Sequence, residues 1–529
     1  MLLDFFIKKL RYIKDAAVLS KEEPVGVPAS LEENLELIRG RVGNGHDVKF
    51  HRFRFGPNAS CEGAVIFVEG MADKNIIDSS VMSPVVGWRR HDDDMPAGLA
   101  MLEDIRSNAL HAADTKLSAS ISEMIDEFLS GNTVMLAEGC AGGIVIGSKG
   151  FSKRSIAEPQ SETVVRGPRE GFTESISDNT SLIRRKIRDE NLRVDHMTVG
   201  TRTKTDICIV YINGIARQAV VDEVKRRINR INVDSILESG YIEQYIEDHP
   251  LSPFSTVGNT EKPDVAASKL LEGRVVILVN GTPFVLTVPM LFIECFQTTE
   301  DYYSRPLYAS MTRVFRYFGF VVSIFAPAVY IALTAFHQEL IPTTLLFSIA
   351  DAREGTPFPV LVETLIMVLA FEMLREAGIR LPRPVGQTIS IVGALVMGDA
   401  AVSAGLVGAP VVITVAFTAV STFLVPSQND SASVLRIVMM VLASIIGWYG
   451  ICMGFLAILV HLASLKSFGT NYFEDISWSE NLQDSIIRMP LWMMKRRPRG
   501  TTGEDKVRTR ELGVFTSPCA DEDEEGSIW

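Results

Sequence analysis

A long apolar stretch, residues 388–423, constrains the fold more than any other part of the chain. It contains one ionisable residue, Asp399, and it is rich in glycine and alanine. An apolar stretch of this length can cross a lipid bilayer, and small residues let membrane helices approach each other closely. The stretch therefore predicts packed membrane helices rather than the core of a soluble domain.

The remaining sequence divides into two unlike halves. Residues 1–310 are rich in charge, whereas 314–465 holds nearly all the long apolar runs, and the mean hydropathy is +0.18 although 22% of the 529 residues are charged. The opening MLLDFFIKKLRYIK is basic and amphipathic and lacks the uninterrupted apolar core of a cleavable signal peptide. We expect a cytoplasmic α/β region followed by a multi-pass α-helical membrane domain.

The charged half contains two pairs of similar segments. VIFVEGMADKNIID (65–78) aligns with IVYINGIARQAVVD (209–222), and VMLAEGCAGGIVI (134–146) resembles VILVNGTPFVLTV (276–288). Each copy has a strand, helical material and a hairpin, a pattern that predicts two similar small α/β subdomains. Chance similarity between short segments is the alternative.

These features give a predicted domain organisation. It comprises an N-terminal extension (1–30), a first α/β subdomain (31–150), a linker with a helix (151–205), a second α/β subdomain (206–300), a membrane domain (301–470) and a cytoplasmic C-terminal tail (471–529). The acidic end of the tail, 521–525, is expected to be disordered. The linker helix is predicted at 181–194. Its basic residues either contact anionic lipid headgroups or pair with Asp189 and Glu190 on a solvated face.

No motif in the sequence indicates catalysis or a cofactor. GGIVIGSKG (142–150) has the glycines of a phosphate loop but places Ser148 before Lys149, the reverse of the order that a Walker A loop needs. HDDD (91–94) lacks further spaced oxygen ligands for a hard cation, and the six cysteines have no CxxC spacing. We predict no catalytic residue, cofactor, metal site or disulfide framework, and no nucleic-acid partner.

The apolar runs indicate four to six membrane spans. They lie at 314–336, 387–405, 408–426 and 434–464, with 357–374 as a further span and 339–350 either re-entrant or crossing. Basic clusters precede the first span, separate 357–374 from 387–405, and follow the last span; the positive-inside rule places all three in the cytoplasm. That rule requires an even number of crossings after the middle cluster, so either one segment is re-entrant, or 434–464 crosses twice, or the middle cluster breaks the rule.

Three acidic residues in the membrane half are candidates for a pore or coupling role: Glu363, Glu372 and Asp399. A charged side chain in the bilayer costs about 2.5–3.5 kcal/mol on insertion scales unless it faces protein or water. The nine-residue step from Glu363 to Glu372 places them on opposite sides of a helix. Each either lines an aqueous path or makes an interhelical contact or, for Glu372, lies at the headgroup level beside Arg375. The helix-packing candidates are Gly393, Gly398, Gly405 and Gly408.

The same membrane half carries a family resemblance. PFPVLVETLIMVLAFEMLREAGIRLPRPVGQTISIVGALVMGDAAVSAGL (357–406) resembles the signature of the GerA family, the A subunits of bacterial spore germinant receptors. The stretches 158–187, 280–306 and 327–359 fit the same pattern, and the resemblance extends over residues 30 to 495.

The resemblance implies a receptor subunit in the inner membrane of a spore. Such a subunit would work with a transporter-like B subunit and a lipoprotein C subunit, and would oligomerise to turn nutrient binding into ion release. The similar stage V sporulation protein AF group leaves an accessory germination channel as the alternative. An autonomous secondary transporter would show inverted repeats, and none is evident. The nutrient, the ion and the subunit number stay open.

Overall fold

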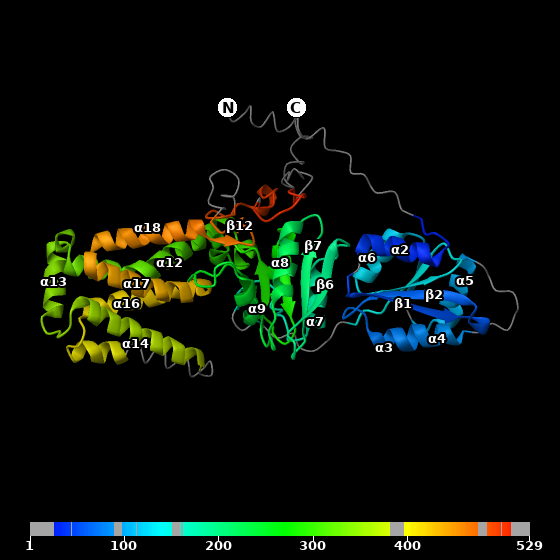
Figure 1. Cartoon of the computed structure of the whole chain (residues 1–529), viewed down its shortest axis with the longest axis horizontal. Helices are drawn as coiled ribbons and strands as arrows, with labels where there is room; N and C mark the ends of the chain where they lie inside the picture. Colours follow the sequence, from blue (N-terminus) through cyan, green and yellow to red (C-terminus); the bar gives the residue numbers. More distant parts are fainter. Residues whose placement is uncertain are drawn as a thin grey trace, which may run out of the picture.

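A computed structural model shows two α/β subdomains and a helical region arranged in a row (Figure 1). The structure describes residues 26–43, 45–88, 98–112, 114–150, 159, 162–380, 396–473, 484–498 and 500–508. Most of the predicted N-terminal extension, the HDDD sequence and the acidic end of the tail lie outside these ranges.

The first subdomain is built on a five-stranded antiparallel sheet with the order β1-β2-β4-β5-β3. In the longest pairing Val48 lies opposite Val68 and Phe55 opposite Cys61. Most of the rejected phosphate loop is strand β5 and the residues just after it, Gly147 to Gly150, which are not helical. The strands are β1 (Val48–Phe55), β2 (Cys61–Val68), β3 (Thr115–Ser118), β4 (Thr133–Ala137) and β5 (Gly143–Ile146).

The second subdomain repeats this architecture. Its sheet has the order β6-β7-β9-β10-β8. This order matches that of the first sheet, with β6 in the position of β1, β7 in that of β2, and so on. The two similar subdomains expected from the duplicated segments are therefore present, and β2 with β7 and β4 with β9 are the paired segments. The strands are β6 (Leu192–Val199), β7 (Thr205–Ile212), β8 (Gly258–Thr260), β9 (Val275–Val279) and β10 (Val285–Val288).

Helices cover both faces of each sheet because successive side chains of a strand point to opposite faces. In the first subdomain one face carries α2 (Leu31–Val42) and α6 (Ile121–Leu129), and the other carries short helices including α3 (Lys74–Ile76), α4 (Ser83–Gly87) and α5 (Leu99–Asp104). In the second, α7 (Ile176–Lys186) and α10 (Pro263–Leu271) oppose α8 (Gln218–Arg230) and α9 (Ser239–Ile246).

The range assigned to the linker needs correction. The helix predicted at 181–194 is α7, which begins at Ile176 with Ser175 as its N-cap and ends at Lys186. Residues 192–199 form β6, an edge strand of the second sheet, so this subdomain starts inside the predicted linker. Buried residues such as Leu192 and Val194 alternate along β6 with polar residues that are less buried. This polar composition led to the prediction of a linker.

The basic residues of α7 make contacts that the sequence did not predict. Arg184 is fully buried, its Nε lies 2.7 Å from Asp47 Oδ2 of the first subdomain, and its Nη2 lies 3.0 Å from the Leu192 carbonyl oxygen. Arg185 and Lys186 pair with Glu170 rather than with Asp189 or Glu190. A buried charge needs such partners, and Arg184 therefore joins the two subdomains.

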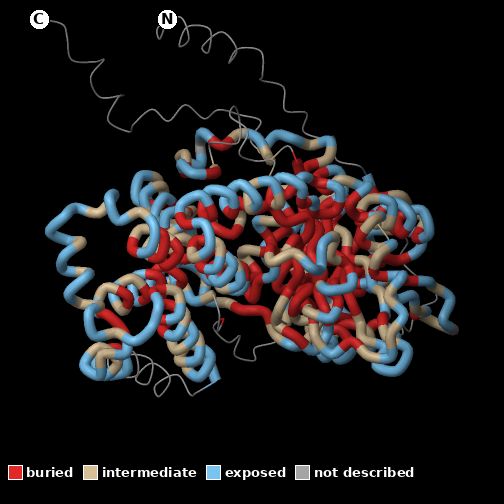
Figure 2. Tube along the Cα trace, turned by 60° about the vertical axis from the view of Figure 1, so that its left-hand side comes forward, coloured by how far each residue is buried: buried red, intermediate tan, exposed pale blue. Residues whose placement is uncertain are grey.

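The helical region follows the second subdomain. Its helices are α12 (Pro306–Ala335), α13 (Thr343–Arg353), α14 (Val360–Arg380), a helical segment at 396–403, α16 (Ala409–Thr422), α17 (Asn429–Ile446) and α18 (Trp448–Ser464). Two of the described helices, Pro306–Ala335 and Pro426–Ile446, are long and apolar enough to cross a membrane. Figure 2 shows that buried residues are concentrated in the α/β region, whereas many positions along the helices are exposed.

Contacts between helices define the path of the chain. Gly447 has a φ of +64° and separates α17 from α18, so the predicted 434–464 run is a pair of packed helices. The predicted span 339–350 falls largely in α13, in which no residue is buried and which lies at the tip of the region (Figure 1). α12 continues through Pro327, and Pro410 lies in the first turn of α16.

The described C-terminal segment, 484–508, packs against the second subdomain. The Gly503 amide donates to the Ile215 carbonyl at 2.7 Å, and the Thr501 hydroxyl donates to the Glu272 carbonyl at 2.9 Å. Thr502 is buried and forms a bridge with Ala216. This part of the predicted tail is therefore integral to the fold.

Candidate coupling site

Arg436 is a buried charge in the middle of the helical region. Its side chain is 1% exposed, and its guanidinium lies 2.9 Å from Glu372 on α14, 2.7 Å from the Ser323 carbonyl on α12 and 3.0 Å from Thr422 Oγ1 on α16. Four helices thus meet at one side chain of α17. The sequence analysis missed Arg436, although a lone arginine in an apolar run was the available signal.

Glu372 is the acidic partner in this cluster. It accepts from Arg436 and from the Ser433 hydroxyl at 3.0 Å, and it pairs with Arg375 at 2.6 Å. The expected proximity to Arg375 is present, but the carboxylate also faces the neighbouring helix α17. In this arrangement Glu372 holds helices together.

Glu363 is fully buried near the opposite end of α14. One carboxylate oxygen accepts from the Gly408 amide, and the other lies 3.4 Å from Arg353 Nε without hydrogen-bonding geometry. The buried hydroxyl of Tyr330 also has no hydrogen-bond partner among the residues that the structure describes. Glu363 therefore links α14 to the turn before α16 and to the end of α13.

Asp399 differs from the two glutamates because it is exposed on the helical segment 396–403. Among the residues that the structure describes, Asp399 makes no hydrogen bond or ion pair. An unpaired carboxylate on an apolar helix is costly in lipid and needs water or a partner chain.

The predicted packing glycines occupy different environments. A Cβ on Gly398 would lie 3.3 Å from Val412 on α16, so this glycine allows close helix contact. Gly405 has a φ of +65° and Gly408 is the N-cap of α16, so both lie in a turn rather than on a helix face. Gly393 lies outside the described residues.

An aromatic cluster fills the junction between the α/β and helical regions. Phe292 contacts Phe254, Phe296 and Tyr472 with ring centroids 5.2–6.0 Å apart, and the cluster also includes Val425. Aromatic pairs in these geometries contribute beyond their buried area. The junction is thus packed like a protein core.

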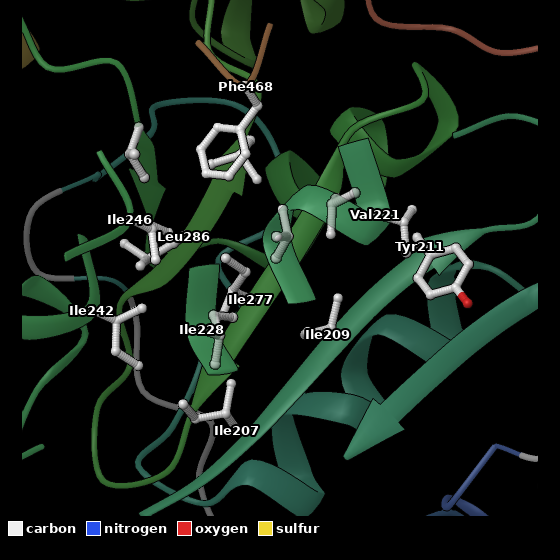
Figure 3. Packing of buried hydrophobic residues seen from close by; sticks show 14 of the residues in the cluster. Ile207, Ile209, Tyr211, Val221, Ile228, Ile242, Ile246, Ile277, Leu286 and Phe468 are labelled. Carbon is white, nitrogen blue, oxygen red and sulfur yellow. The ribbon is translucent and has the colours of Figure 1, made fainter. Parts of the chain in front are cut away.

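A short hairpin after α18 extends this junction into the second subdomain. It consists of β11 (Lys466–Ser467) and β12 (Thr470–Asn471), and Phe468 at its tip joins the core formed by β7, β9, α8 and α9 (Figure 3). The guanidinium of Arg227 lies 4.3 Å from the Phe468 ring centroid, and Asp248 accepts from the Phe468 amide at 2.7 Å. A movement of α18 would therefore displace a side chain in the core of the second subdomain.

A buried ion cluster holds the start of α12. Arg313 lies 2.8 Å from Asp301 and 3.0 Å from Asp484, and Arg316 also pairs with Asp301. Burial raises the pKa of Asp484 above its usual value, although the nearby charge of Arg313 opposes this shift. The first predicted basic cluster is therefore largely engaged within the protein, and the C-terminal segment contacts α12 directly.

Metal ligation has no support within the described ranges, where no three His, Cys, Asp or Glu side chains gather. The HDDD residues lie outside these ranges. The contacts around Arg436 join the helices to one another. Those around Phe468 join the end of α18 to the second subdomain, and those around Arg313 join α12 to the residues before it and to the C-terminal segment. We call these contacts the coupling site.

Comparison with protein families gives a match over residues 36–500 to the family described as Bacillus/Clostridium GerA spore germination protein. Spore germination protein KA of Bacillus subtilis (strain 168) is 44% identical over 492 residues, covering 92% of this chain and 90% of the relative. Stage V sporulation protein AF of the same organism is 32% identical, and the match covers 85% of this chain and 90% of that relative.

A solved structure also matches. The N-terminal domain of the A subunit of the Bacillus megaterium spore germinant receptor GerK3 is 34% identical, with a TM-score of 0.40, covering 51% of this chain and 99% of that domain.

Proposed function

The chain belongs to the GerA family of spore germination proteins, and from this membership we propose that it is the A subunit of a germinant receptor in the spore inner membrane. It works with a transporter-like B subunit and a lipoprotein C subunit. It self-associates, and in the complex it turns nutrient binding into ion release. The observation that carries this proposal is the family match over residues 36–500.

The direction of the helices supports a multi-pass arrangement. The first half of α12 packs against the aromatic junction through Tyr317 and Phe320. α18 ends at the same junction, where His461 Nε2 lies 2.9 Å from Ser252 Oγ of the second subdomain. Both ends of the helical region therefore lie on the same side, which requires an even number of crossings. By the positive-inside rule this side is the cytoplasm, the spore core.

Asp399 is the residue we assign to the ion path. Its exposure in a single chain suits a carboxylate that faces water or a second subunit in an oligomer. Glu363 and Glu372 are the coupling residues, since their contacts join helices that must shift relative to each other if the region opens.

Deletion of the gene tests this function. Spores without the gene should fail to germinate with at least one nutrient and should recover when the gene is restored. Slower germination with every nutrient would instead favour the accessory channel. Stage V sporulation protein AF, the relative that represents this alternative, is 32% identical to the chain, whereas spore germination protein KA is 44% identical. Normal germination throughout the nutrient panel would contradict both proposals. Flanking genes for B and C subunits would distinguish the two candidates independently.

A further inference from the structure

The loop after α9 places an apolar tip at the end of the helical region. The Ser252 amide donates to the His249 carbonyl at 2.9 Å, and this turn presents Pro250 and Leu251 outward. The Leu251 side chain is 99% exposed. An exposed leucine at a turn is ordinary on a soluble surface, so its meaning depends on its surroundings.

Two contacts fix this loop to helix ends. Ser252 Oγ lies 2.9 Å from His461 Nε2 in the last turn of α18, and Ser431 Oγ at the start of α17 donates to the Pro253 carbonyl at 2.5 Å. Phe254 is buried in the aromatic junction just beyond. The loop therefore lies where α17 begins and α18 ends.

The outer surfaces of both helices are apolar close to these contacts. Val434 follows Ser431 by one turn and is 55% exposed, and Val460 precedes His461 and is 69% exposed. Leu251 thus lies one or two residues from the contacts that join the loop to the ends of α17 and α18, whose outer surfaces the proposed function places in lipid. Helix ends at a bilayer lie at the boundary between hydrocarbon and headgroups.

Two acidic side chains beside the tip are paired within the protein, whereas Asp430 at the start of α17 is exposed. Asp248 pairs with Arg227 at 2.5 Å, and Glu247 accepts from the Thr256 amide at 2.9 Å. Tyr245, in the last turn of α9, is 54% exposed, and tyrosine is enriched at membrane interfaces because its ring is amphipathic. The paired acidic side chains and the exposed tyrosine lower the free-energy cost of placing this acidic loop against a bilayer.

From these observations we infer that the Pro250–Leu251 tip inserts into the boundary of the same bilayer leaflet from which α17 and α18 emerge. The tip anchors the second subdomain to the membrane surface independently of the helices. This inference rests on the proposed function, because it requires the helical region to lie in a membrane.

Spin labelling of the full chain in lipid nanodiscs tests the inference. Cysteines are introduced singly at Leu251, at Val438 on the outer surface of α17 and at Val86, a 50% exposed apolar position in the first subdomain. The background lacks Cys61, Cys452 and Cys519. Burial raises the pKa of the remaining thiols, to about 11 for Cys140 and about 12 for Cys208 and Cys295, so they stay protonated and resist labelling.

The measurement compares collisions of the label with oxygen, which concentrates in lipid, and with a water-soluble nickel chelate. We expect labels at 251 and 438 to favour oxygen and the label at 86 to favour the chelate. A label at 251 that behaves like the one at 86 overturns the inference. Protection at 251 from both reagents also overturns it, because it would show that protein covers the tip. An aqueous label at 438 would instead contradict the proposed membrane placement itself.

Discussion

At the scale of single residues, the helical region depends on Arg436 because its charge has little access to solvent. Replacing Arg436 with Gln removes the buried partner of Glu372, which keeps its contacts with Arg375 and Ser433. Breaking a buried ion pair on one side costs up to about 3–5 kcal/mol. We expect the detergent-solubilised full chain to unfold at a clearly lower temperature. Arg380→Gln, which removes an exposed pair with Glu376, should have little effect. Equal unfolding temperatures for the two variants would contradict the role of Arg436.

The acidic residues should separate into two classes when neutralised. Asp399→Asn keeps the shape of an exposed side chain, so we expect normal protein abundance and slower cation release from nutrient-triggered spores. Glu363→Gln retains an acceptor for the Gly408 amide but loses the attraction to Arg353. Its main effect should be reduced abundance. Cation release at the wild-type rate from Asp399→Asn spores would remove Asp399 from the ion path.

Sequence reasoning reached the acidic candidates and placed Arg375 beside Glu372, but it did not find Arg436 or the partners of Glu363. Glu363 and Glu372 stood out because charges are rare in apolar runs. The same reasoning, applied to Arg436 inside the predicted 434–464 span, would have found it too. Phe468 gave no signal at all. A phenylalanine after the last helix has no distinctive pattern, and only the fold shows that it enters the core of a subdomain far away in the sequence.

At the scale of elements, central strands were predictable and edge strands were not. β7 and β9 are continuous apolar runs because both faces of the sheet are covered. β6 is an edge strand with polar side chains at its more open positions, and β8 is three residues long, so neither has the continuous apolar run of a central strand. The turn positions of Gly405 and Gly408 were also hidden, because a run of small residues predicts close packing without showing where one helix ends.

Helix packing at Gly398 can be tested with a compensating change. Leucine at position 398 would collide with Val412, since even a Cβ would lie 3.3 Å from that side chain. We expect Gly398→Leu to lower the abundance of the complex in spore membranes. Adding Val412→Ala should restore part of it, because the second change makes room. Normal abundance of the single variant would contradict the contact.

At the scale of the whole molecule, the described C-terminal segment returns to the second subdomain. The described C-terminal segment bonds to this subdomain and to α12, so the α/β region and this segment must lie on one side of the membrane. Single cysteines at the exposed positions Glu36 and Glu504 should therefore both resist a membrane-impermeant reagent in intact cells. Labelling of both would reverse the proposed orientation. Labelling of only one would contradict the packing of the C-terminal segment.

The central claim is that the protein transmits the germination signal through contacts between its second subdomain and its helices. Phe468→Ala removes the side chain that connects α18 to the core of this subdomain. Phe128→Ala is the matched control, because Phe128 is equally a core phenylalanine but lies in the first subdomain, away from the junction. Each change should cost about 3–5 kcal/mol in folding stability, so protein levels must be matched by expression.

The deciding measurement is nutrient-triggered cation release from spores that contain equal amounts of the two variants. Coupling free energies of about 1–3 kcal/mol correspond to changes of about 5- to 150-fold. We therefore predict that release from Phe468→Ala spores is slower by about tenfold or more, while Phe128→Ala spores release cations at close to the wild-type rate. Equal rates of release from the two variants would contradict the claim that the signal passes through this junction.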